Sequence, residues 1–224
     1  MRELGARLLA VAEAIPECTT LVDCGCDHGF VSIYAAKCGR AENITASDIN
    51  EGPLENAKKE IAAAGLQGKI KTVLCDGLDG VEPHECVVIA GMGGETVAGI
   101  ISRAAWTKEN CTLILQPMTK LEILREFLYN EGFEIPAEVF VRESGHMYSV
   151  ITARFSGKTE ILPYEKYISR AGLSSPLAKE YTDAVLARLC RELESRSTAG
   201  ALSESEKRER ERDIESLRNV RGTL

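Results

Sequence analysis

The sequence predicts an α/β fold in which helices cover a parallel sheet. Five short apolar segments alternate with helix candidates, and two longer segments follow as a hairpin: residues 21–24, 44–48, 70–74, 86–90 and 112–116, then 133–141 and 147–155. Acidic residues or glycines follow four of the five short segments. Crossovers between parallel strands are right-handed, so the carboxyl ends of these strands share one edge, where such folds bind ligands.

Length and composition suit one α/β domain with an appendage, since 44% of the 224 residues are hydrophobic and 27% are charged. We expect a sheet domain over residues 1–157 and a helical domain over residues 158–224. The chain contains no run of about 18 apolar residues and no apolar leader, so we expect a cytoplasmic protein without a membrane segment. We favour a monomer.

The net charge of −7 is unevenly distributed. Residues 1–157 hold 14 basic and 22 acidic side chains, whereas residues 158–224 hold 13 and 12. A polyanion would therefore have to contact local patches or the C-terminal segment.

The eight cysteines do not form a metal-binding pattern. No Cys-x-x-Cys occurs, and the close pair Cys24 and Cys26 lacks a second cysteine pair to complete a zinc site. We therefore expect no metal site, and cysteines that act as small buried hydrophobes in a reducing compartment.

The first strand runs into a glycine turn that reads D-x-G-x-D-x-G, with Asp23, Gly25, Asp27 and Gly29 at its fixed positions. A dinucleotide site requires G-x-G-x-x-G, and two carboxylates would repel a pyrophosphate. A ligand with a cationic amino-acid end suits the turn better, and S-adenosylmethionine (SAM) is such a ligand. Taken alone, the stretch is also compatible with an ordinary structural turn.

Two more acidic residues end strands. Asp48 is the last residue of the second strand, where such folds bind ribose hydroxyls, although a helix N-cap is the alternative. Asp76 follows the third strand beside Gly77, where it would accept from an adenine amino group while the backbone meets the ring edge. Alone, this would be a common turn.

The fourth strand leads into Gly91-Met92-Gly93-Gly94, and so many glycines imply close approach of backbone to a ligand or substrate. Upstream, a helix is expected over residues 2–15, with Arg7 at the edge of its apolar stripe. The Arg7 guanidinium would reach a ligand carboxylate at the sheet edge, or would simply be solvated.

The C-terminal segment predicts an antiparallel helical hairpin. One helix opens at Ser175-Pro176 and breaks at residues 197–200, and a second opens at a capping box formed by Ser203 and Glu206. Its charged face is either a solvated surface or an arm that touches RNA. A similar capping box, Thr119 with Glu122, predicts a helix over residues 119–130.

Six motifs together resemble the bacterial tRNA (adenine-22-N1)-methyltransferase family: residues 23–29 (DCGCDHG), 50–53 (NEGP), 76–78 (DGL), 88–94 (VIAGMGG), 113–117 (LILQP) and 142–143 (RE) with Tyr148. The resemblance covers the whole chain. It departs mildly at Cys24 and Cys26, where isoleucine and serine are expected, and at Asp48, where many members have glutamate.

The resemblance implies a SAM-binding Rossmann-like class I methyltransferase domain, a coiled-coil-like C-terminal helical hairpin, and methylation of N1 of adenine 22 in tRNA. The expected cofactor-binding residues are Arg7, Asp23, Gly25, Cys26, Gly29, Asp48, Ile49, Asp76, Gly77, Leu78, Ala90 and Gly91. The residues expected at the transferred methyl and the acceptor base are Asp27, His28, Met92, Gly93 and Tyr148.

Several roles have a structural alternative. Asp27 would stabilise the cation that forms on the base. His28 would orient the base or act as a cap, and Tyr148 would stack a flipped-out base or pack in the sheet. The strand-four turn lacks the Asp/Asn-Pro-Pro-aromatic motif of exocyclic-amine methylation, which favours a ring nitrogen. Competing functions are methylation of a small molecule or another RNA, and a non-catalytic SAM- or RNA-binding module.

Overall fold

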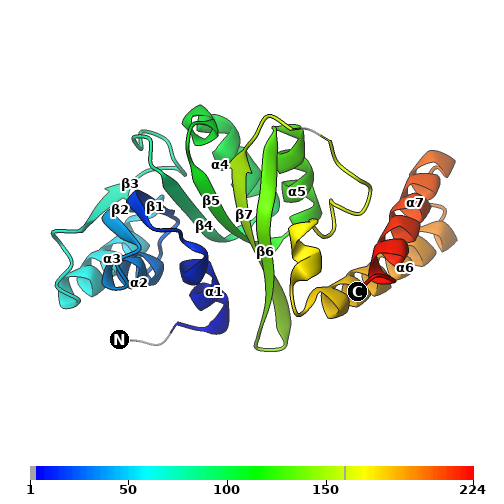
Figure 1. Ribbon diagram of the computed structural model, residues 1–224, viewed down its shortest axis with the longest axis horizontal. Coiled ribbons are helices and arrows are strands. Elements are labelled where there is room, and N and C mark those ends of the chain that lie inside the picture. Colours follow the sequence, from blue (N-terminus) through cyan, green and yellow to red (C-terminus); the bar gives the residue numbers. More distant parts are fainter. Residues whose placement is uncertain (1–3, 159) are drawn as a thin grey trace.

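The computed structural model describes residues 4–158 and 160–224 and contains a seven-stranded sheet with the order β3-β2-β1-β4-β5-β7-β6 (Figure 1). The first five strands in this order are parallel, and β7 is antiparallel to both β5 and β6. The predicted α/β fold, with its parallel core and terminal hairpin, is confirmed.

The strands are β1 (Cys18–Cys24), β2 (Ala41–Asp48), β3 (Ile70–Leu74), β4 (Cys86–Gly93), β5 (Thr112–Thr119), β6 (Phe133–Glu143) and β7 (His146–Phe155). The helices are α1 (Ala6–Ala14), α2 (Phe30–Lys37), α3 (Glu51–Ala63), α4 (Gly94–Arg103), α5 (Leu121–Asn130), α6 (Ala178–Thr198) and α7 (Glu204–Arg221), with 3₁₀ turns η1 (Ala105–Lys108) and η2 (Ala171–Ser174). The predicted first helix therefore starts later than residue 2, and residues 2 and 3 lie outside the described part.

Helices bury both faces of the sheet. Helices α1, α2 and α3 pack on one face, where they share a core with Leu21 and Val88. Helices α4 and α5 pack on the other, against Val22 and Val87. Neighbouring residues of a strand point to opposite faces, so a strand that is covered twice must be apolar at successive positions. The central strands β4 and β5 therefore carry continuous apolar runs, over residues 86–90 and 113–115.

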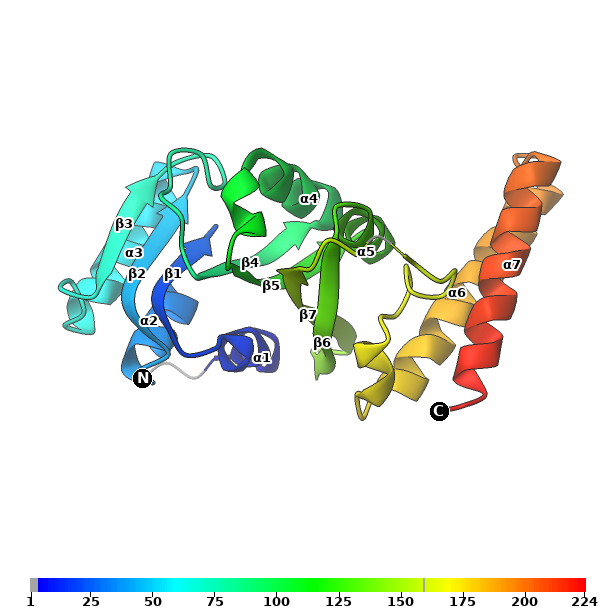
Figure 2. The same cartoon turned by 45° about the horizontal axis from the view of Figure 1, so that its top comes forward.

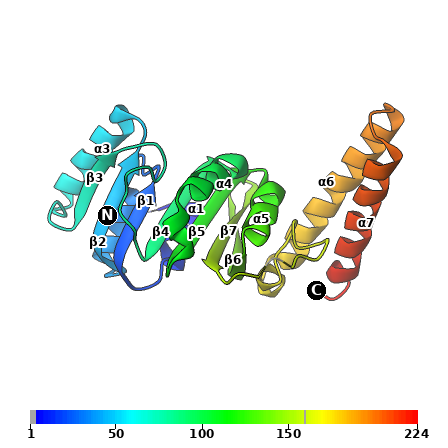
Figure 3. The same ribbon diagram turned by 90° about the horizontal axis from the view of Figure 1, so that it is seen from above.

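The C-terminal helices α6 and α7 form a hairpin beyond the β6 edge of the sheet (Figures 2 and 3). A third apolar cluster joins Phe140 of β6 to Val185 and Leu189 of α6 and to Ile214 and Leu217 of α7. The Ser203–Glu206 capping box is present, with the serine hydroxyl and the glutamate each accepting from the other's backbone N–H. The predicted hairpin is thus confirmed, while the domain boundary at residue 157 stays a prediction.

The capping box predicted at Thr119 and Glu122 is wrong. Thr119 is the last residue of β5, and α5 begins at Leu121 after Lys120, which has a φ of 56° and provides no side-chain cap. The reason is that β4 continues to Gly93 rather than ending at residue 90, and Thr119 pairs with Gly93 across the sheet. Pairing between strands here outweighs a local helix signal.

Candidate functional site

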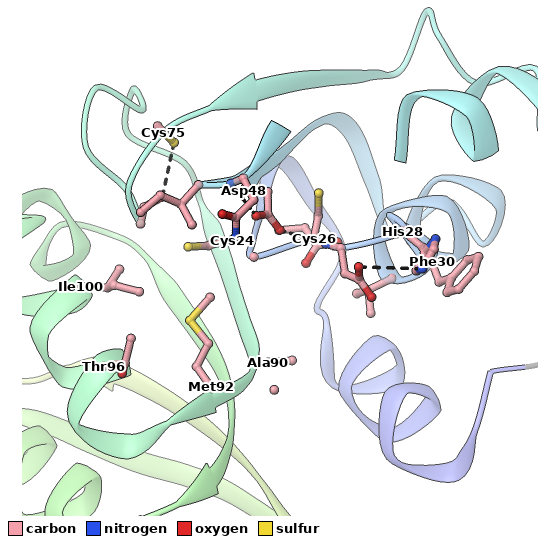
Figure 4. A pocket seen from close by; sticks show the side chains of 18 of the residues that line it. Cys24, Cys26, His28, Phe30, Asp48, Cys75, Ala90, Met92, Thr96 and Ile100 are labelled. Carbon is pink, nitrogen blue, oxygen red and sulfur yellow. Dashed lines mark hydrogen bonds and ion pairs between the residues drawn. The ribbon is translucent and has the colours of Figure 1, made fainter. Parts of the chain in front are cut away.

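A cavity of about 520 Å³ opens at the carboxyl ends of β1, β2, β3 and β4 (Figure 4). In Figure 4, Cys24, Cys26 and Asp48 line one side of it, and Met92, Thr96 and Ile100 line the other. Its volume is within the range of small-molecule sites. Of the seventeen site residues predicted from the sequence, thirteen line this cavity: Arg7, Asp23, Gly25, Cys26, Asp27, His28, Asp48, Ile49, Asp76, Gly77, Ala90, Gly91 and Met92.

Asp23, at the end of β1, is fixed by the helix that follows. One oxygen of its buried carboxylate accepts from the backbone N–H of Ser32 at 3.2 Å and from the Ser32 hydroxyl at 2.7 Å. Ser32 lies in the first turn of α2, whose N-cap residue, Gly29, provides no side-chain cap. Burial raises the pKa of Asp23 to about 6. The turn therefore holds a carboxylate that is costly to keep charged without a cationic partner.

Gly25 allows the turn to pass close to the end of β4. It has a φ of 76°, and a Cβ at this position would lie 2.2 Å from Cε of Met92. A larger residue would therefore displace the Met92 side chain within the cavity.

Asp48 ties two segments of the cavity wall together. Its carboxylate accepts from the backbone N–H of Asn50 at 2.9 Å and from that of Asp27 at 3.2 Å. These bonds fix the end of β2 against the β1 turn and leave the carboxylate on the cavity wall. The N-cap residue of α3 is Asn50, so Asp48 does not fill the N-cap position. Ile49 is 59% exposed beside it and offers an apolar surface.

The third acidic residue, Asp76, is more exposed. Nη2 of Arg103 donates to its Oδ1 at 3.2 Å. The adjacent Gly77 has a φ of 61°, and a Cβ there would lie 2.9 Å from Cγ1 of Ile100. The β3 turn therefore approaches α4 closely, with polar backbone and an apolar side chain at one end of the cavity.

Arg7 reaches the cavity from α1. Its Nη1 donates to Oε1 of Gln116 at 2.6 Å, and its backbone N–H donates to Oε1 of Glu143 at 3.1 Å. Its guanidinium carbon also lies 5.7 Å from the centroid of the Tyr148 ring. The guanidinium is therefore held at the cavity wall rather than solvated, and it retains further N–H donors.

Asp27 and His28 lie at the mouth of the cavity. Asp27 has a φ of 50°. The side chains of Asp27 and His28 are 69% and 40% exposed, with Nε2 of His28 3.8 Å from Oδ1 of Asp27. The His28 ring stacks on Phe30 with centroids 5.3 Å apart. Both polar groups are therefore accessible to a second ligand that approaches from solvent.

Four predicted residues do not line the cavity. Leu78 is buried in the core under α4, and Gly93 is the N-cap residue of α4, next to Thr119. Gly29 lets α2 approach α3, because a Cβ there would lie 3.3 Å from Cβ of Ala57. Tyr148 lines a second cavity of about 270 Å³, with Met118 and Leu121 among its neighbours. The first three are thus packing positions.

Other residues of the wall were not predicted: Leu8, Cys24, Phe30, Val31, Asn50, Cys75, Thr96 and Ile100. Most are chain neighbours of predicted residues. Thr96 and Ile100 come from α4, where positions i and i+4 share one helix face. Their sequence signal is that the helix containing them directly follows the glycine turn at the sheet edge, so its first turns face the cavity.

The set of donors and acceptors fits an amino-acid nucleoside. A guanidinium suits a carboxylate, a buried carboxylate suits an ammonium, and Asp48 suits a pair of hydroxyls. The backbone of Gly91 also borders open space, since a Cβ there would meet only Nη1 of Arg7, at 3.9 Å. These residues therefore fit SAM.

Among the described residues, no group of three or more His, Cys, Asp or Glu side chains is arranged to hold a metal ion. All eight cysteines are free thiols. Burial raises the pKa of Cys24 to about 12, so this thiol in the cavity wall stays protonated and is a weak nucleophile. In the part of the chain that the structure covers, no helix has the length and apolar character needed to cross a membrane.

Comparisons with known proteins agree with this geometry. A methyltransferase-domain family matches residues 4–151. The tRNA (adenine(22)-N(1))-methyltransferase of Bacillus subtilis is 34% identical over 200 residues, which cover 86% of this chain and 82% of that protein.

Solved structures give the same result. The B. subtilis m1A22 tRNA methyltransferase has a TM-score of 0.85 at 27% identity, covering 98% of this chain and 99% of that one. A candidate tRNA (m1A22) methyltransferase from Streptococcus pneumoniae, solved in complex with S-adenosyl-L-methionine, has a TM-score of 0.82 at 27% identity, covering 97% and 99%. The chain therefore belongs to the tRNA (adenine(22)-N(1))-methyltransferase family.

Proposed function

We propose that this protein binds SAM in the 520 Å³ cavity and methylates N1 of adenine 22 in tRNA. The main support for the proposal is that one cavity is lined by three acidic residues and one arginine, namely Asp23, Asp48, Asp76 and Arg7. The family membership of the chain supports the choice of substrate.

Different residues would contact different parts of the cofactor. Asp48 would accept from the ribose hydroxyls. Asp76 and the Gly77 backbone would meet the adenine, with Ile49 and Ile100 against the ring. Arg7 and Asp23 would hold the carboxylate and ammonium of the methionine end, beside the glycine turn. This division follows the order of the strand ends in the sheet, from β3 to β1.

The bound cofactor supplies an electrophilic methyl group on a sulfonium. N1 of neutral adenine carries an in-plane lone pair, so the protein needs no strong base and instead positions the nucleophile and excludes water. Asp27 lies at the mouth, where its carboxylate would stabilise the positive charge that develops on the base. His28 would orient the base, and Met92 would form the wall beside it.

The acceptor base must leave its helix, because N1 of a paired adenine is hydrogen-bonded. Tyr148 would stack this base from the second cavity, with the Arg7 guanidinium between its ring and the cofactor. The α6–α7 hairpin would contact the rest of the tRNA, since the acidic residues exceed the basic ones by eight in residues 1–157 but not in residues 158–224. Such an enzyme would act in the cytoplasm, and we favour a monomer.

Labelled-methyl transfer from SAM to an unmodified tRNA transcript, followed by nucleoside mass spectrometry, tests the proposal. We expect 1-methyladenosine as the product. Transfer to a small molecule, or to another nucleoside, would instead assign the site to a different acceptor. SAM binding without any transfer would favour a binding module.

A further inference from the structure

Gln116 is a completely buried polar residue within β5, and it lies outside the cavity wall. Its Oε1 accepts from Nη1 of Arg7 at 2.6 Å and from the backbone N–H of Gly91 at 3.2 Å. Its Nε2 donates to the carbonyl oxygen of Pro117 at 3.0 Å and to Sδ of Met118 at 3.6 Å. All four hydrogen-bonding positions of the amide are therefore used.

This network allows only one orientation of the amide. If the group were flipped, its NH₂ would face two donors, Arg7 and the N–H of Gly91. A buried amide with a fixed orientation is a rigid support, because leaving its partners unsatisfied is costly.

Both groups that donate to Oε1 belong to the cavity wall. Gly91 has a φ of 81° and lies at a register shift between β4 and β5, so the sheet does not fix its N–H. Arg7 has a competing partner, Glu143, whose Oε2 lies 3.8 Å from Nε of Arg7. Without Gln116, the guanidinium would turn towards that carboxylate and away from the cavity.

We propose that Gln116 is a positioning residue for cofactor binding, which acts by holding the Arg7 guanidinium at the cavity wall, while its bond from the Gly91 N–H keeps the amide in place. The inference rests on the proposed function, in which Arg7 binds the carboxylate of SAM. It adds a residue that does not itself touch the ligand.

The test compares SAM dissociation constants from titration calorimetry with melting temperatures. The variants are Gln116→Met, Gln116→Glu, Arg7→Met, the double variant Arg7→Met/Gln116→Met, and Thr107→Val as a control. Thr107 is matched because its buried hydroxyl also makes a hydrogen bond, to the carbonyl of Ala104 at 2.8 Å, but it lies outside the cavity wall.

We expect Gln116→Met to weaken SAM binding about tenfold, the loss of one charge-assisted hydrogen bond. Gln116→Glu keeps both acceptor roles, so its affinity should stay within about threefold of wild type even if its melting temperature falls. The double variant should bind no more weakly than Arg7→Met, because Gln116 acts through Arg7. Thr107→Val should lower the melting temperature without changing the affinity.

Two results would overturn the inference while leaving the proposed function intact: additive effects in the double variant, or an equal loss of affinity in Gln116→Met and Gln116→Glu. Unchanged affinity in Arg7→Met would instead refute the role of Arg7 in the proposed function. The two failures are therefore distinguishable.

Discussion

One oxygen of the Asp23 carboxylate accepts two hydrogen bonds from Ser32, from its N–H at 3.2 Å and from its hydroxyl at 2.7 Å. The strand thereby caps the helix that follows it, in place of a side chain at Gly29. The carboxylate is nevertheless so deeply buried that its pKa is raised to about 6. A charge that destabilises the free protein is expected where a cationic ligand group binds.

Asp23→Asn should stabilise the free protein near pH 7. The pKa of Asp23 is raised from its ordinary 3.8 to about 6, so between these pH values the folded state holds a proton that the unfolded state has lost. The stability of the wild type therefore falls as pH rises through this window, by an amount on the order of 3 kcal/mol. Urea unfolding at pH 4 and pH 7 should show the variant gaining stability, relative to wild type, only at the higher pH. An equal difference at both pH values would contradict this assignment.

Asp48→Ala should weaken SAM binding by about 10- to 100-fold, because a bidentate contact to the ribose is lost. Asp79→Ala is the control, because Asp79 is an acidic residue that follows the neighbouring strand β3 but does not line the cavity. Calorimetric titration measures both. If Asp48→Ala binds as tightly as wild type, the ribose assignment is wrong.

Gly25→Ala should lower SAM affinity more than Gly39→Ala. The two glycines have similar backbone strain, with φ values of 76° and 68°. Alanine at 39 meets nothing within 4 Å, whereas alanine at 25 meets Met92. Both variants should therefore lose about 1 kcal/mol of stability, and only Gly25→Ala should change the cavity. Equal affinities in the two variants would show that Met92 moves without consequence for the ligand.

Arg125→Met should destabilise the protein by about 3–5 kcal/mol, because it leaves the Glu138 carboxylate buried without its cation. The two side chains are 1% and 0% exposed, and Nη2 lies 2.5 Å from Oε1. Arg125 also donates to the Tyr181 hydroxyl of α6 at 3.1 Å, so the pair joins the hairpin to the sheet.

Lys108→Met is the control for that variant. Lys108 forms an exposed ion pair with Glu131 at 2.8 Å, and its loss should cost at most about 1 kcal/mol. Urea unfolding of the two variants gives the comparison. Equal losses would mean that burial of the Arg125 pair adds nothing.

The sequence predicted the site best where function depends on strand order. Asp23, Asp48 and Asp76 each lie at or just beyond the carboxyl end of a strand, and parallel topology alone brings strand ends together. The sequence did not predict features that depend on pairing between two strands. The extension of β5 to Thr119 depends on pairing with Gly93, which no local pattern reveals.

The role of Gln116 also could not be predicted from the local sequence. Gln116 belongs to the LILQP motif, yet its role appears only when Arg7, 109 residues earlier, donates to it. Leu78 shows the converse: its place in a functional motif suggested a ligand contact, and the fold buries it under α4.

Methylation of adenine 22 at N1 can be located by mapping the modified nucleotide in the tRNA. Because a methyl group on N1 blocks the Watson–Crick edge, reverse transcription of tRNA treated with enzyme and SAM should stop next to position 22. We expect this stop to disappear when guanosine replaces the adenosine at that position. Methyl transfer without such a stop, or with a stop elsewhere, would show that the enzyme does not methylate N1 of adenine 22.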